Sequence, residues 1–90
     1  VFARAEITIK KETDAIIIPS SALVRKREGL YVFVIEEDIA KQRMVISGMS
    51  QGNQVEILQG LEEDEQIVVS GNLTLQDGDR ILITNREERQ

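Results

Sequence analysis

The pattern of apolar positions changes from one short stretch of the chain to the next, but its period suits strands. Over residues 1–10 every odd position is apolar, namely Val1, Ala3, Ala5, Ile7 and Ile9. This period of two predicts a strand with one covered face. Residues 30–35 are apolar at every position, so we expect a central strand there that is buried on both faces.

A second apolar run covers residues 15–18 and stops at Pro19, the only proline of the chain. Proline ends a strand because it has no N–H for the hydrogen-bond ladder. Ser20 or Ser21 follows and could cap a single helical turn.

The remaining apolar segments are short and alternate with turn residues. Residues 40–47 are expected to return as the hairpin partner of residues 30–35, and three further strands are expected at 55–57, 67–69 and 81–83. We therefore predict a mainly β fold, a small antiparallel β-roll or barrel-like domain of about seven short strands with one or two helical turns.

Composition narrows the chemistry of this small β domain. The net charge of −5 argues against a nucleic-acid partner, because neutralising phosphates takes clustered Lys and Arg. The chain has no Cys and no His, which excludes disulfides and removes the commonest general base and the commonest zinc ligands. Met44 and Met49 are interpreted as packing and loop residues, not as Cu(I) ligands. We expect no metal ion and no cofactor.

Acidic residues gather at two turns, and neither group has the pattern of a catalytic or metal site. Residues 62–65 are four consecutive acids, which point in different directions and stay in solvent, whereas an acid–base pair needs two carboxyl groups held in one cleft. Asp77 and Asp79 flank Gly78, but the further ligands of a calcium loop are missing. A β-turn with Gly78 at positive φ is predicted instead, and no residue is predicted to be catalytic.

Arg25, Lys26 and Arg27 form the one basic cluster of the chain, and Gly29 follows shortly after. A charged run that ends at glycine is typical of a solvent-exposed hairpin tip. Contact with an acidic partner or with lipid headgroups is the alternative interpretation.

Five motifs, taken in order, carry a resemblance to a known family: "VFARAEI", "AIIIPSSAL", "GLYVFVI", "RMVISG" and "VEILQGLEEDEQIVVSGNLTLQDGDRILI". Together they resemble the C-terminal part of periplasmic adaptor subunits, or membrane fusion proteins, of RND-type tripartite efflux pumps, over about residues 1–84. One departure is that such adaptors commonly have Gly-Asp where this chain has Asp64 and Glu65.

The resemblance implies a division of the chain. Residues 1–14 would be the last strand of the adaptor β-barrel domain with its connecting turn, residues 15–84 the membrane-proximal β domain, and residues 85–90 a disordered tail. It also implies a place in the periplasm, associated with the inner membrane through the parent protein.

The function implied is that of a non-catalytic adaptor domain. It would dock on an inner-membrane transporter, of RND type, and on neighbouring adaptor subunits of a homo-oligomer, with an outer-membrane channel as an indirect partner. An adaptor for an ABC-type exporter is one alternative, and a free-standing small β-barrel binding module, or less plausibly a carboxylate enzyme, is another. Exposed turn residues are the predicted partner contacts: Arg25, Lys26, Arg27, Glu36, Glu37, Asp38, Gln51 and Asn53.

Overall fold

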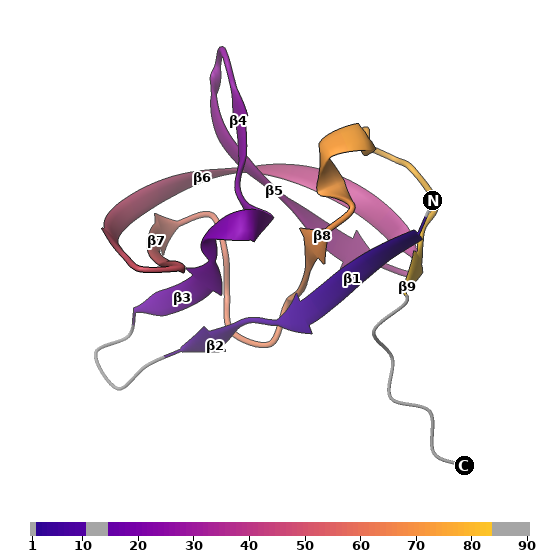
Figure 1. Cartoon of the computed structure of the whole chain (residues 1–90). Coiled ribbons are helices and arrows are strands. Elements are labelled where there is room, and N and C mark those ends of the chain that lie inside the picture. Colours follow the sequence, from indigo (N-terminus) through magenta and orange to yellow (C-terminus); the bar gives the residue numbers. More distant parts are fainter. Residues whose placement is uncertain (1, 11–14, 84–90) are drawn as a thin grey trace.

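In the part of the chain that the structure describes, nine strands form one curled sheet, accompanied by two 3₁₀ turns (Figure 1). The computed structural model describes residues 2–10 and 15–83, so the predicted disordered tail at 85–90 lies outside the described residues. The elements are β1 (Phe2–Ile7), β2 (Ile9–Lys10), β3 (Ile16–Pro19), η1 (Ser20–Ala22), β4 (Val24–Lys26), β5 (Gly29–Glu36), β6 (Ile39–Gln51), β7 (Gln54–Gln59), β8 (Gln66–Ser70), η2 (Asn72–Thr74) and β9 (Leu82–Ile83). The predicted mainly β class is confirmed.

A single stretch of chain connects opposite sides of the curled sheet. Its strand order is β2-β3-β7-β6-β5-β8-β1-β9, and β4 adds to one side of β5. Only Thr8 separates β1 from β2, yet β1 pairs with β8 while β2 pairs with β3, at the other end of the order. The continuous segment from β1 to β2 therefore connects the edge strand β2 to the strand next to the opposite edge.

β5 is the central strand of the core, as its unbroken apolar run predicted. Val32 and Val34 are buried in a cluster formed by the inner faces of β3, β6, β7 and β8. Phe33 and Ile35 point the other way, into a second cluster with β1 and the segment around β9. Because successive side chains of a strand alternate between faces, one strand supports two cores.

The predicted pairing of β5 with β6 is also confirmed, with a register from Leu30 opposite Val45 to Glu36 opposite Ile39. Glu37 and Asp38 join the two strands at φ values of 52° and 65°. Two consecutive left-handed residues are the mark of a type I′ hairpin turn, whose twist matches the strands it joins.

The predicted alternation in the first strand is wrong beyond Ala5. Ile7 was expected on the covered face but is 52% exposed, and Thr8, expected outside, is only 2% exposed. The phase changes because β1 ends at Ile7 and the Thr8 side chain turns inward to hydrogen-bond the loop before β8.

The sequence predicted one or two helical turns, and the structure has two 3₁₀ turns. The predicted side-chain cap of the first turn by Ser20 or Ser21 is wrong. η1 begins directly after Pro19 and has no side-chain cap; the Ser21 hydroxyl instead donates to the Val69 carbonyl oxygen at 2.8 Å. Asn72, which begins η2, is buried and donates to the carbonyl oxygens of Ser21 and Ala22 at 3.0 and 3.3 Å. The two turns are thus fastened to each other. No helix within residues 2–10 and 15–83 has the length and apolar character needed to cross a membrane.

Candidate docking surface

The acid loop, residues 62–65, is held against the break between β1 and β2. The buried Thr8 hydroxyl donates to the Glu62 carbonyl oxygen at 2.6 Å and accepts the Glu65 amide at 2.9 Å. The Thr8 amide donates to the Glu65 carbonyl oxygen at 2.7 Å, and the Asp64 amide donates to the Thr8 carbonyl oxygen at 3.2 Å. One threonine therefore fixes the course of the whole loop.

The carboxyl group of Glu65 has a structural partner. It lies 2.6 Å from the guanidinium group of Arg43, and its other oxygen accepts the Glu62 amide at 2.9 Å. Asp64 has φ 71°, which is the left-handed conformation that favours glycine. Asp64 therefore has a backbone conformation that suits the glycine expected at this position from the resemblance to adaptors.

The second acidic turn is built in the same way. The Asp77 carboxylate accepts the Gln42 amide of β6 at 2.8 Å, and the Asp79 carboxylate accepts the Gln76 amide at 2.9 Å. Gly78 has φ 94°, as the predicted β-turn requires. Among the described residues there is no group of three or more acids placed to hold a metal ion.

The eight predicted contact residues are all exposed, but they lie on three separate turns. Residues 25–27 form the tip between β4 and β5, and residues 36–38 lie beside the segment before β9, where the Ile81 amide donates to the Asp38 carbonyl oxygen at 2.9 Å. Gln51 and Asn53 lie beside β3, where the Ser20 amide donates to the Asn53 carbonyl oxygen at 2.8 Å. These three corners stand apart in Figure 1, so the structure does not bring the residues into one patch.

Two surface features were not predicted. The outer side of β6 and β7 exposes Met44, Ile46 and Leu58, each by more than half. Leu58 leans over Gly48, where an added Cβ would lie 3.1 Å from its Cδ2 atom. The alternation of residues 42–46, with Met44 and Ile46 on one face, was the sequence signal for this apolar strip.

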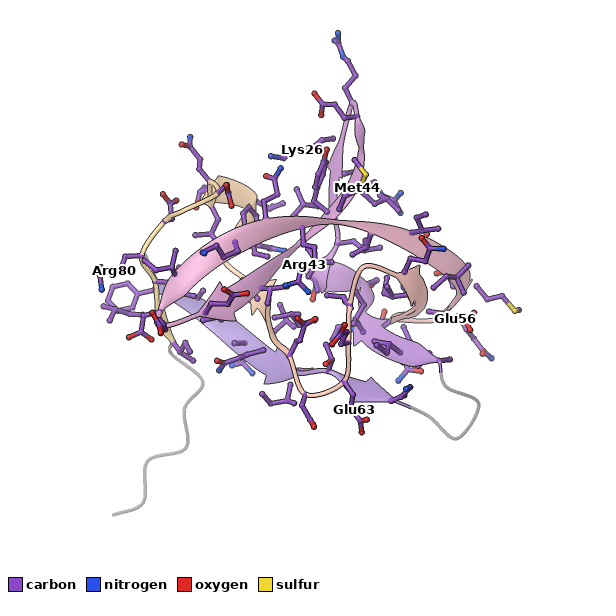
Figure 2. All side chains as sticks on the ribbon, turned by 180° about the vertical axis from the view of Figure 1, so that it is seen from behind. Lys26, Arg43, Met44, Glu56, Glu63 and Arg80 are labelled. Atoms are coloured by element: carbon purple, nitrogen blue, oxygen red, sulfur yellow. The ribbon has the colours of Figure 1, made fainter. Side chains whose placement is uncertain are left out.

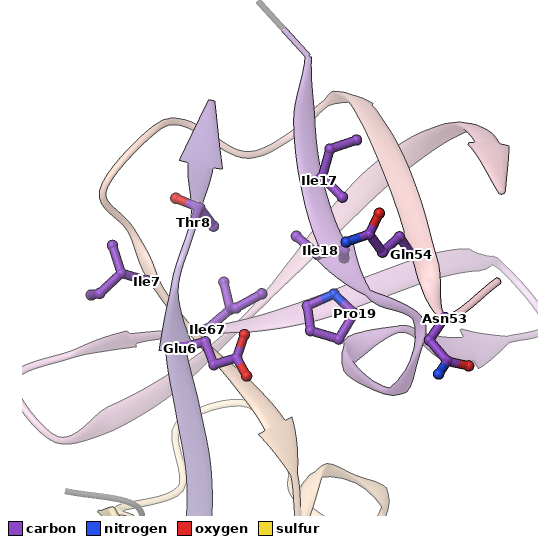
Figure 3. A pocket seen from close by; sticks show the side chains of 9 residues that line it. All are labelled: Glu6, Ile7, Thr8, Ile17, Ile18, Pro19, Asn53, Gln54 and Ile67. Atoms are coloured by element: carbon purple, nitrogen blue, oxygen red, sulfur yellow. The ribbon is translucent and has the colours of Figure 1, made fainter. Parts of the chain in front are cut away.

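The other feature is a groove of about 350 Å³ between β1 and β3 (Figure 3). Its lining is mostly apolar, and Glu6, Asn53 and Gln54 contribute the polar groups besides Thr8. Asn53, a predicted contact residue, lines this groove. Hydrophobic periodicity did not predict this groove, because it arises where β1 pairs with β8 while β2, the next strand along the chain, pairs with β3.

Comparison with known families identifies the family of this chain. Residues 15–83 match the family described as YknX, C-terminal permuted SH3-like domain. The chain belongs to this family. The YknX-type domain accounts for the described residues from β3 to β9, and β1 and β2 precede the matched range.

Relatives of the YknX-type domain carry efflux names. The multidrug resistance protein MdtA of Erwinia amylovora is 37% identical over 78 residues, which are 86% of this chain and 19% of that protein. MdtA of Pantoea ananatis is 29% identical over 89 residues (98% and 22%), and the efflux pump periplasmic linker BepD of Brucella suis is 32% identical over 71 residues (78% and 18%). The chain spans about a fifth of the length of these relatives. The predicted resemblance to membrane fusion proteins is confirmed.

Proposed function

We propose that this chain is a non-catalytic domain of a periplasmic adaptor in a tripartite efflux or secretion system. The observation that carries the proposal is the family match over residues 15–83, together with relatives named as a multidrug resistance protein and as an efflux pump periplasmic linker. The domain would lie in the periplasm and be associated with the inner membrane through the parent protein.

The arrangement of polar groups supports a passive role. Thr8 and Asn72 are the buried polar residues of the described chain, and both side chains form hydrogen bonds with backbone groups. Glu65, Asp77 and Asp79 likewise fasten loops. A catalytic role would need titratable groups held against each other in a cleft, whereas the carboxylates of Glu65, Asp77 and Asp79 accept backbone amides at two separate turns.

The partners proposed are an inner-membrane transporter of RND type and neighbouring adaptor subunits, with the outer-membrane channel reached indirectly. An ABC-type exporter is the alternative transporter. Because the predicted contact residues occupy three corners, we propose that each corner meets a different neighbour. We also propose the division inferred from the resemblance, with residues 1–14 ending a β-barrel domain and residues 15–84 forming the membrane-proximal domain.

Site-specific photo-crosslinking in the full-length parent protein tests the partners. A crosslinking amino acid would replace Lys26, Asp38 or Gln51, one for each corner, and Thr74 as an exposed control outside the predicted set. We expect crosslinks from Asp38 and Gln51 to the transporter or to a second adaptor, from Lys26 to one of these proteins or to phospholipid, and none from Thr74. Equal crosslinking from all four positions, or none from the corners, would contradict the proposed contacts, and an ABC subunit in the product would decide the transporter class.

A further inference from the structure

The hairpin formed by β4 and the start of β5 projects from the sheet (Figure 1). We call residues 24–31 the basic hairpin. Arg25, Lys26, Arg27 and Glu28 at its tip are all exposed. Among the described residues neither guanidinium group has an ion pair, so two full positive charges stand at the end of a projecting element.

The base of the basic hairpin is apolar on the face that carries Lys26. The Lys26 ammonium group lies 5.5 Å from the centre of the Tyr31 ring and donates to the Gln42 side chain at 2.6 Å. Met44, which pairs with Tyr31 across β5 and β6, is 53% exposed. A basic tip above a tyrosine and a methionine is the composition found at the boundary between lipid headgroups and acyl chains.

The basic tip differs in sign from the rest of the molecule, so a negative surface attracts the molecule with this hairpin toward it. The tip carries three positive charges and the one negative charge of Glu28, a net +2, in a chain of net charge −5. Glu63 of the acid loop lies at the opposite end from Lys26 (Figure 2), and the molecule measures 36 × 35 × 22 Å. Since charges are screened over about 8–10 Å at ordinary salt, a negative surface at the tip attracts the hairpin and barely repels the acid loop.

We propose that the basic hairpin docks on an anionic phospholipid surface. The hairpin would lie with the face of Lys26, Tyr31 and Met44 against the surface. The three basic side chains would then contact the phosphate groups, and Tyr31 and Met44 would reach the edge of the acyl region. A lipid surface fits better than an acidic protein because no ion pair within residues 2–10 and 15–83 holds the two arginine side chains in one geometry. Fixed protein acceptors would require both to be ordered, whereas headgroups rearrange around them. The proposal does not depend on the efflux role, since it needs no other protein.

Co-sedimentation of the chain with vesicles tests the proposal. Vesicles of phosphatidylcholine alone are compared with vesicles of equal parts phosphatidylcholine and phosphatidylglycerol. Each basic residue near an anionic surface raises partitioning about fivefold, so a tip of net +2 should favour the anionic vesicles about 25-fold. The preference should vanish in about 1 M salt, where screening shortens to about 3 Å.

The hairpin variant is Arg25→Gln/Lys26→Gln/Arg27→Gln, which should lose the whole preference. The matched control is Arg4→Gln/Lys41→Gln/Arg80→Gln, in which three exposed basic residues outside the hairpin are removed and the net charge changes equally. The control should keep the preference to within about twofold. Far-ultraviolet circular dichroism verifies that both variants are folded.

Tyr31 provides a second readout, because it is the only tyrosine and the chain has no tryptophan. Brominated phosphatidylglycerol should quench its fluorescence in the wild-type chain and not in the hairpin variant. Equal losses in both triple variants would show an effect of net charge alone and overturn the proposal. Undiminished vesicle binding by the hairpin variant would also overturn it, and would assign the hairpin to an acidic protein surface instead.

Discussion

Replacing Thr8 by valine tests whether one buried hydroxyl group holds the acid loop in place. The hydroxyl makes two hydrogen bonds, to the Glu62 carbonyl oxygen and from the Glu65 amide, and Thr8 is 2% exposed. Valine has nearly the same shape without the hydroxyl. Each backbone group left without a partner costs about 1–3 kcal/mol, and we expect the lower end because Glu62 is exposed to water. The free energy of unfolding should therefore fall by about 2 kcal/mol.

Two companion variants separate the hydroxyl from the methyl group of Thr8. Serine keeps the hydroxyl and removes one buried methyl group, which should cost about 1 kcal/mol. Alanine removes both, so its loss should approach the sum of the other two, about 3 kcal/mol. This ordering, with alanine the least stable and serine the most stable of the three, is specific to a residue that acts mainly through hydrogen bonds.

Urea unfolding followed by circular dichroism measures these differences. With a denaturant slope of about 1 kcal/mol per molar urea, the valine variant should unfold at about 2 M less urea than the wild type. Hydrogen exchange adds a local readout, since the Glu65 amide loses its acceptor and should exchange faster than the strand amides of β5. If valine is as stable as threonine while serine is the weakest, Thr8 is only an apolar filler and the reasoning is wrong.

Further variants address backbone conformation and the core, all by the same unfolding assay. Asp64→Gly should raise the free energy of unfolding by about 0.5 kcal/mol, and Asp64→Ala should lower it by about 0.5 kcal/mol. Both variants remove the same charge, so a change of the same sign and size in the two would show that the φ of 71° is not the cause. Gly60→Ala should cost more than Gly52→Ala by at least about 1 kcal/mol, because a Cβ at Gly60 would lie 2.5 Å from the Met44 carbonyl oxygen whereas Gly52 has open space; equal losses would refute the clash. Phe33→Ala should cost about 3–5 kcal/mol, since this side chain is fully buried in the second cluster, and a loss under about 1 kcal/mol would argue against a packed second core.

The sequence predicted best where local pattern and burial agree. The apolar run of residues 30–35 became the doubly buried β5, residues 40–47 became its hairpin partner β6, and Gly78 took the positive φ of a turn. Each of these depends on neighbours within a few positions along the chain.

Long-range contacts explain what the sequence did not predict. Ile7 and Thr8 exchange their expected faces because the loop at 62–65, more than fifty positions away, needs the Thr8 hydroxyl. The parallel pairing of β1 with β9 likewise joins the two ends of the described chain. Burial of Asn72 follows from its bonds to η1. Hydrophobic periodicity carries no information about such pairings.

For the surface as well, the sequence predicted which residues are exposed but not how they are arranged in space. Exposure of the eight turn residues followed from turn chemistry, but their distribution over three corners follows from the strand order. The basic cluster at residues 25–27 was recognisable from charge alone, whereas its projection away from the sheet, with Tyr31 and Met44 at its base, required the structure.

A chimera tests the adaptor role most directly. In Erwinia amylovora MdtA the segment that matches this chain is replaced by the corresponding residues of this chain, and drug resistance is measured in a strain that lacks its own MdtA. We expect the chimera to restore resistance. The same chimera with Val34→Asp, which places a charge in the core, should not restore it. A chimera that is produced at the normal level and is folded, yet restores no resistance, would contradict the account.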